Sequence, residues 1–174
     1  MRNVDLQHPL YKKVFQNVFK SLQLSSLYVL YYDLDWTKDE ILEYQAILQK
    51  VDEYVKSKKL TEKEILEHNE QFINFDCVKE NEQLPYRFKM KMCDVKYKQK
   101  MIATVGAAAD SSAGIHLAFA VYVLSLYYHF NRKQIMEWYN HLIKFCELYV
   151  NGMTDKHILQ YFEQECQLHI TEED

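Results

Sequence analysis

YVLYYDLDWTKDEILEYQAILQKVDEYVK, residues 28–56, and YVLSLYYHFNRKQIMEWYNHLIKFCELYV, residues 122–150, are two copies of one pattern. The copies align without a gap at an offset of 94 residues, and the match resumes after a one-residue deletion at 60–71 and 153–164. A repeat of this kind indicates architecture rather than chemistry. We therefore predict an internal duplication, in which two similar three-helix units pack as one compact all-α domain. The identical residues of the first copy are Tyr28, Val29, Leu30, Ile41, Glu43, Leu48, Lys50 and Glu53.

Working outward from the first copy, apolar residues recur at spacings of three and four from Leu10 to Val29, which predicts a helix over 8–32. Thr37 followed by Glu40 has the spacing of a capping box and predicts a second helix that ends near residue 57. Thr61 followed by Glu64 repeats this spacing and predicts a short third helix.

The second copy carries the same signals. We predict a long helix over 108–130, a helix that begins after Asn131 and ends near Asn151, and a last helix that begins after Thr154 and ends near residue 166. Gly152 suits a left-handed turn at the end of the middle helix. The predicted organisation is a first helical unit at 1–72, a basic connecting segment at 73–106 and a second helical unit at 107–174.

Composition agrees with long helices around a substantial core. Of the 174 residues, 48% are hydrophobic, and only 3 are Gly and 2 are Pro, too few for a fold rich in tight turns. The apolar run at 115–128 is shorter than the ~20 residues of a membrane span and contains His116, so we predict a buried core helix there. Four cysteines without a CxxC pair and a polar N-terminus without a signal peptide predict a reduced, cytoplasmic protein.

The connecting segment supports two structures. In residues 86–92, Arg87, Lys89 and Lys91 alternate with apolar residues, which is typical of a strand. However, residues 86, 90, 93, 97, 101 and 105 also fall on one helical face, and Pro85 suits a helix start. We favour the helix, and a small β-hairpin near 86–105 is the alternative.

Charge is distributed unevenly, although the net charge is only −4. Residues 33–82 contain 14 acids and 7 bases, whereas the connecting segment is strongly basic. Lysines interleaved with aromatic rings resemble a surface that follows a phosphate backbone, and a solvated amphipathic face is the alternative interpretation. The predicted partner-binding or nucleic-acid-binding residues are Tyr86, Arg87, Lys89, Lys91, Lys96, Tyr97, Lys98 and Lys100.

Motifs for catalysis or metal binding are not found. The histidines and cysteines lack the paired spacing of zinc ligands, and three glycines leave no phosphate-binding loop. Asp33 and Asp35 flank a turn, but helix-end acids usually cap a helix or face water, and the pair has no counterpart in the second copy. We therefore predict a protein that is not an enzyme and that needs no metal and no cofactor.

The segments Leu27–Trp36, Ile41–Tyr44, Phe75–Glu80 and Leu84–Lys91 resemble a pattern in small helical proteins of phages and mobile elements of Gram-positive bacteria. Those proteins often carry glycine before the turn aromatic, where this chain has Asp35. The resemblance implies a cytoplasmic accessory role and includes anti-CRISPR proteins. It carries over no enzymatic residue.

Two functions follow as expectations. The first is a non-enzymatic inhibitor that binds a host protein or protein–nucleic-acid complex, in its most concrete form an anti-CRISPR protein acting on a CRISPR effector nuclease. The second is a DNA- or RNA-binding accessory protein of phage replication or recombination. For both functions the oligomeric state stays open between monomer and homodimer. Two units within one chain can imitate a homodimer, which favours a monomer, whereas an exposed tyrosine or small-residue face would allow a homodimer.

Overall fold

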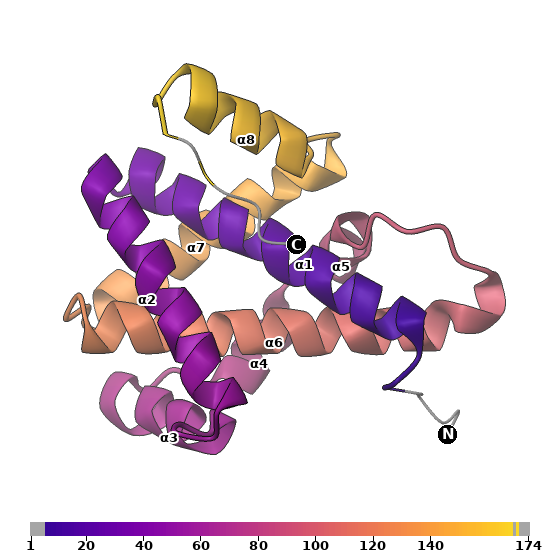
Figure 1. The fold of residues 1–174 in the computed structure, drawn as a ribbon, viewed down its shortest axis with the longest axis horizontal. Coiled ribbons are helices and arrows are strands. Elements are labelled where there is room, and N and C mark those ends of the chain that lie inside the picture. Colours follow the sequence, from indigo (N-terminus) through magenta and orange to yellow (C-terminus); the bar gives the residue numbers. More distant parts are fainter. Residues whose placement is uncertain (1–5, 169, 171–174) are drawn as a thin grey trace.

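The computed structural model describes residues 6–168 and residue 170, and the described residues form helices and loops without strands (Figure 1). The prediction of one all-α domain is confirmed. In chain order the elements are α1 (Pro9–Tyr28), η1 (Val29–Asp33), α2 (Lys38–Lys56), α3 (Glu62–Ile73), α4 (Cys77–Gln83), α5 (Tyr86–Met92), η2 (Gln99–Met101), α6 (Ile102–Leu126), α7 (Arg132–Val150) and α8 (Asp155–Gln164).

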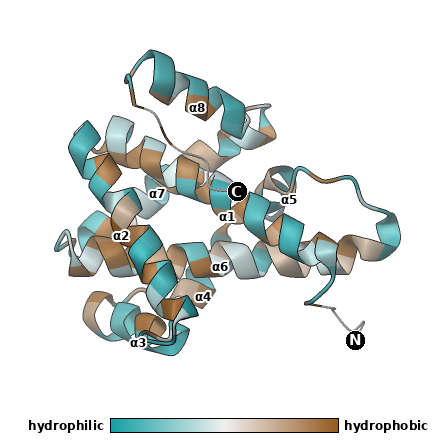
Figure 2. Cartoon of the chain, viewed as in Figure 1, coloured by the Kyte–Doolittle hydropathy of each residue, from teal (hydrophilic) through white to brown (hydrophobic). Residues whose placement is uncertain are grey.

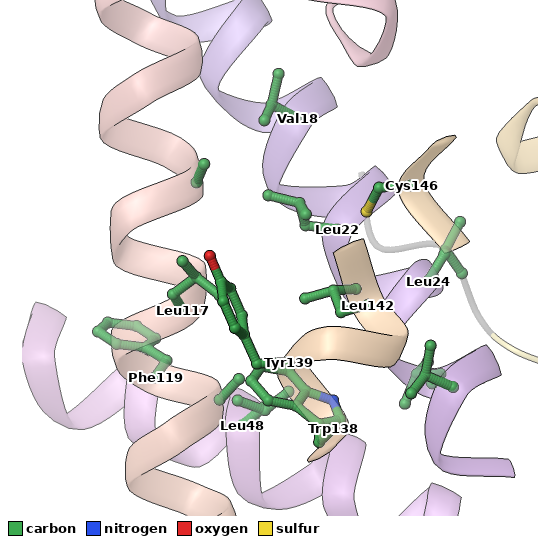
Figure 3. Close-up of a cluster of buried hydrophobic side chains, with 14 of the residues drawn as sticks. Val18, Leu22, Leu24, Leu48, Leu117, Phe119, Trp138, Tyr139, Leu142 and Cys146 are labelled. Atoms are coloured by element: carbon green, nitrogen blue, oxygen red, sulfur yellow. The ribbon is translucent and has the colours of Figure 1, made fainter. Parts of the chain in front are cut away.

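The two long helices α1 and α6 pack along each other and form the centre of the molecule (Figure 1). Ser112 Oγ of α6 donates to the carbonyl oxygen of Phe15 in α1 at 2.7 Å, and Ala108, Ala109 and Ala113 are fully buried. The small residues thus allow two helix backbones of the same chain to approach closely. Apolar side chains fill the space between α1, α6 and α7, where Leu22, Leu117 and Leu142 point toward one another (Figure 3).

Helix α6 is buried on several sides, because α1, α3, α4 and α5 all contact it. Length and composition alone would let Gln99–Leu126 cross a membrane, because one window of it has a mean hydropathy of 1.3. However, 67% of its most apolar window is buried inside the protein, which is common for a core helix, and Figure 2 shows apolar residues spread along it. A helix that is apolar on most of its circumference needs neighbours on several sides, and α1, α3, α4 and α5 supply them.

The turns that start the middle helices of the two copies have the same geometry. Asp35 and His129 both have φ near 55°, and the backbone N–H of the next residue donates six residues back at 3.0 Å in each copy. Thr37 and Asn131 then cap α2 and α7 with complete capping boxes. The two helices that follow both contain 19 residues.

The copies also end alike, beyond the residues in which their sequences match. Asn74 follows α3 with φ 53°, and Gln167 follows α8 with φ 51°. After each of these left-handed residues, the next backbone N–H donates six residues back, from Phe75 to Asn69 at 3.0 Å and from Leu168 to Phe162 at 2.8 Å. Phe75 and Leu168 are both buried. The structural correspondence therefore continues past the aligned sequence.

The two units exchange their outer helices. The third helix of the first unit, α3, packs on α6, and the third helix of the second unit, α8, packs on α1. Likewise α2 contacts α6 and α7 contacts α1. Such reciprocal contacts are what a duplicated helical unit would form around a two-fold relation. Duplication as the origin of the chain stays a prediction.

One difference separates the copies at the end of their first helices. In the first unit η1 is a single π-helical turn, with the Leu34 N–H donating to Val29 O at 3.1 Å. In the second unit the corresponding turn is α-helical, with the Tyr127 N–H donating to Val123 O at 3.0 Å.

Two predicted details of the connecting region were wrong. Residues 86–92 form the favoured helix, but α5 ends at Met92, and the predicted face from residue 86 to residue 105 does not exist. Phe88, Lys89 and Met92 are buried instead, while Tyr86 is 53% exposed. Helix α6 also begins at Ile102 rather than near Ala108, because the small residues before Ala108 are helical and close-packed.

Candidate functional site

The predicted basic residues lie on α5 and on the loop that links it to α6. Phe88 and Met92 anchor α5 in the core, and the side chain of Asn17 in α1 donates to the carbonyl oxygen of Cys93 at 2.7 Å. Asp94, with φ 40°, then turns the chain outward. The basic loop is therefore fixed at its start to both the core and α1.

Five of the six predicted cations are exposed: Arg87, Lys91, Lys96, Lys98 and Lys100. We call these five residues the basic surface. Figure 1 shows that the loop carrying most of them lies at the same end of the molecule as the start of α1. Lys12 and Lys13, also exposed, are on that part of α1. Sequence reasoning missed these two lysines, because the contact between Asn17 and Cys93 joins residues 76 positions apart.

Lys89 does not belong to the basic surface, and its prediction as a binding residue was wrong. Its side chain is buried, and Nζ donates to the carbonyl oxygen of Asn81 and to Asp110 Oδ1, both at 2.8 Å. A buried ammonium group requires such partners, since an unpaired charge in the interior is very unfavourable. Lys89 holds α4, α5 and α6 together, and its buried ammonium group is not accessible to a phosphate.

The two predicted aromatic residues remain accessible. Tyr86 is 53% and Tyr97 is 37% exposed. The hydroxyl of Tyr86 lies against α6, 3.4 Å from the point where a Cβ on Gly106 would be. Burial raises the pKa of Tyr86, with smaller contributions from Tyr97 and Asp110, so the phenol stays neutral and can donate a hydrogen bond at neutral pH. Both rings adjoin the basic surface and could stack on bases.

Two serine–histidine pairs occur, and their positions argue against nucleophilic catalysis. Ser26 Oγ lies 2.8 Å from His116 Nε2, but both residues are fully buried. Burial also lowers the pKa of His116 to about 3, so its ring stays neutral. In the second pair, His68 Nε2 lies 3.1 Å from Ser125 Oγ, which itself donates to the carbonyl oxygen of Tyr122. Within the described part of the chain, neither pair has a carboxylate that orients the imidazole.

The described cysteines and acids likewise form no assembled site. Burial raises the pKa of Cys77 and of Cys93 to about 11, so both thiols are neutral at physiological pH. Of the two acids at the turn, Asp33 pairs with His141 Nδ1 at 3.1 Å, and Asp35 occupies the left-handed turn position. Among residues 6–168 and 170, no group of three or more His, Cys, Asp or Glu side chains could hold a metal ion.

Comparison of the chain with protein-family models, with curated proteins and with solved structures finds no match. The geometry therefore has to be interpreted by its own chemistry. It presents an exposed basic surface with two accessible tyrosines, one of which, Tyr86, lines a hollow together with Glu82 of α4.

Proposed function

We propose that this protein is a non-enzymatic interaction protein of phage type, which binds and inhibits a host protein–nucleic-acid machine. Its most concrete form is an anti-CRISPR protein that acts on a CRISPR effector nuclease in the cytoplasm of the host cell. The observation that carries this proposal is the basic surface, whose five cations are exposed on a helix and loop that the core holds in place.

The opposite charges of the two regions suit such a target. An effector complex offers exposed phosphates of its guide and a positively charged channel for its nucleic-acid duplex. The basic surface is complementary in charge to the guide phosphates, and the carboxylates of α2 to α4 are complementary to the positively charged channel. Residues 61–83 alone carry 7 acids against 2 bases. Complementary charge chiefly speeds association and excludes wrong partners, while apolar contacts supply much of the affinity.

The test is cleavage of target DNA by a purified effector nuclease loaded with its guide. We expect inhibition near equimolar inhibitor, and a loss of at least tenfold in potency for the combined variant Lys96→Glu, Lys98→Glu and Lys100→Glu. The matched control changes three exposed lysines of α7 and α8 in the same way: Lys133→Glu, Lys144→Glu and Lys156→Glu. Undiminished cleavage at a large molar excess removes the anti-CRISPR form, and equal potency of the two variants removes the basic surface from the mechanism.

A second candidate function is direct DNA or RNA binding in phage replication or recombination. The specific observation in its favour is the position of Tyr86 and Tyr97 beside the basic surface, since stacking rings and cations together characterise single-strand binding sites. Fluorescence anisotropy with a labelled 20-nucleotide DNA strand tests it. We expect log affinity to fall linearly with log salt, with a slope that decreases by ~0.7 for each of Lys91→Ala, Lys96→Ala and Lys98→Ala.

The same titration separates the two candidates. Lys133→Ala is the matched control for the three alanine variants and should leave the salt slope unchanged. A flat titration at low salt eliminates direct nucleic-acid binding, while inhibition of the effector nuclease could still be observed. Sedimentation velocity completes the experiment, because it decides between monomer and homodimer.

A further inference from the structure

An open groove of about 410 Å³ runs between α3, α4 and α6. Its floor is apolar and buried, whereas its walls are exposed, with Leu66 of α3 at 39% and Val78 of α4 at 64%. Exposed apolar residues beside an apolar floor mark a surface that excludes water when a partner covers it. The floor is made by Ile65, Cys77, Ala118 and Phe119.

The groove is a place where the two units differ. On α6 it is lined by Gly114 and Ala118, and the positions 94 residues earlier on α1 are Lys20 and Leu24. Glu62 at the groove corresponds to Asp155 of α8, which accepts a hydrogen bond from Ser21 of α1 at 2.9 Å. In the part of the chain that the structure describes, Glu62 accepts no corresponding hydrogen bond from α6. Gly114 and Ala118 are thus smaller than the residues at the corresponding positions of α1, and the groove beside them is open.

The shape of the groove fits a helix. Its lining on α6 recurs at spacings of four from Asp110 to Gly114 and Ala118, a stripe of nine residues, or ~14 Å of helix. A helix that presents apolar residues at i, i+3 or i+4 and i+7 covers a stripe of that length. A strand would need a sheet edge to pair with, and the described residues form no sheet.

The charge of the groove specifies the polar face of that helix. Residues 61–83, which supply the α3 and α4 walls, have a net charge of −5. Glu62 lies at the rim, and a second hollow shares Val78, Asn81 and Asp110 with the groove and adds Glu82. Because Asp110 is already paired with Lys89, Glu62 and Glu82 are the carboxylates available to a partner. Lysine or arginine residues flanking an apolar stripe would complement them.

We infer that the groove between α3, α4 and α6 is a docking site for a cationic amphipathic helix of a partner protein. Two or three apolar side chains of that helix enter between Leu66 and Val78, and its basic residues meet Glu62 and Glu82 at the rim. None of the five residues of the basic surface lines the groove, so the inference stands or falls independently of the proposed function.

The experiment uses the full chain and a fluorescein-labelled 18-residue peptide of leucine and lysine with leucines at i, i+3, i+4 and i+7. The reference peptide has the same composition in an order that disperses the leucines. We expect anisotropy to give a Kd at least tenfold lower for the amphipathic peptide. Leu66→Lys should weaken binding at least tenfold, because it places a cation in the apolar wall. Its matched control is Leu42→Lys, in which a leucine of similar exposure on α2 is changed.

Three outcomes overturn the inference. Equal affinity for the two peptides shows attraction by charge alone, and equal loss for Leu66→Lys and Leu42→Lys places the binding elsewhere. If sedimentation shows self-association that Leu66→Lys abolishes, the occupant is a second copy of this chain. A Gly114→Leu variant, which fills the groove from α6, provides an independent check should Leu66→Lys fail to fold, and weaker binding is expected.

Discussion

The ring centroids of Tyr28 in α1 and Tyr161 in α8 lie 5.0 Å apart. The corresponding pair in the other unit, Tyr122 of α6 and His68 of α3, has the same separation of 5.0 Å. In both pairs the first helix of one unit meets the third helix of the other. These contacts connect the two units directly. Because of them, neither unit is expected to be stable when it is separated from the other unit.

A first prediction concerns this exchange of helices. A double-mutant cycle with Tyr28→Leu and Tyr161→Leu should give a coupling free energy of about 0.5–1.5 kcal/mol in urea unfolding, the range for paired aromatic rings. Coupling near zero would mean that the rings touch without stabilising the junction. Tyr28→Leu combined with Tyr86→Leu on α5 is a control, because the rings found in contact with Tyr28 among the described residues are those of Tyr32, Phe145, Tyr161 and Phe162.

A second prediction separates two lysines that are neighbours on α5. Lys89→Met should lower the free energy of unfolding by about 1–2 kcal/mol, because it leaves Asn81 O and Asp110 without their buried donor. This value is smaller than for a fully buried ion pair, since Asp110 is 53% exposed. Lys91→Met, at an exposed position, should change stability by less than ~0.5 kcal/mol. Equal effects in urea unfolding would contradict the structural role of Lys89.

A third prediction compares two buried tyrosines. The hydroxyl of Tyr44 is buried without a hydrogen-bond partner, whereas that of Tyr139 donates to the carbonyl oxygen of Glu80 at 2.5 Å. Tyr44→Phe should therefore be neutral or stabilising by up to about 1 kcal/mol, because it removes an unpaired polar group and keeps the ring contacts with Trp36 and Tyr128. Tyr139→Phe should destabilise by about 1 kcal/mol. Thermal unfolding of both variants tests whether the two substitutions change the stability in opposite directions.

A fourth prediction concerns acid stability. Burial lowers the pKa of His116 from 6.5 to about 3 in the folded state. As the pH falls below 6.5, the unfolded chain binds this proton first, so the free energy of unfolding decreases, by about 1.4 kcal/mol per pH unit for one site. The loss should continue until the pH approaches 3. In His116→Gln this contribution is absent, and the difference between the two pH profiles isolates it from the carboxylates.

NMR gives the direct measurement of the same group. The ring signals of His116 should stay those of a neutral imidazole down to about pH 4. Titration of His116 near pH 6.5 in the folded protein would contradict its burial against Phe19 and Ser26.

A fifth prediction uses two glycines in opposite conformations. Gly152 has φ 105°, a value that strains any L side chain, although a Cβ there would touch nothing within 4 Å. Gly152→Ala should therefore destabilise the protein by about 1 kcal/mol through the backbone alone. Gly114 is helical, and its Cβ would lie 3.4 Å from Asn81 Nδ2, so Gly114→Ala should stabilise by about 0.5–1 kcal/mol. Differential scanning calorimetry of both variants would show the opposite shifts in Tm.

The sequence by itself determined the starts of α2, α3 and α7. Thr37, Thr61 and Asn131 are local signals, because a capping side chain bonds to a backbone N–H only two or three residues away. The repeat likewise predicted that α2 and α7 have the same length, because similar local sequences form similar local structure. The end of α5 at Met92 and the helical start of α6 lacked such signals, and those boundaries were misplaced.

Only the tertiary structure decided which charges and which surfaces are accessible. Lys89 and Lys91 share the same basic stretch of sequence, yet Lys89 is buried by Asp110, 21 residues further along the chain, and Lys91 remains exposed. The packing of α1 places Lys12 and Lys13 at the same end of the molecule as the basic loop. The acidic groove lies where α3 packs beside Gly114 and Ala118 of α6. Burial is a sum over neighbours that are distant in sequence, so local pattern cannot specify it, whereas helix formation depends on residues within one or two turns.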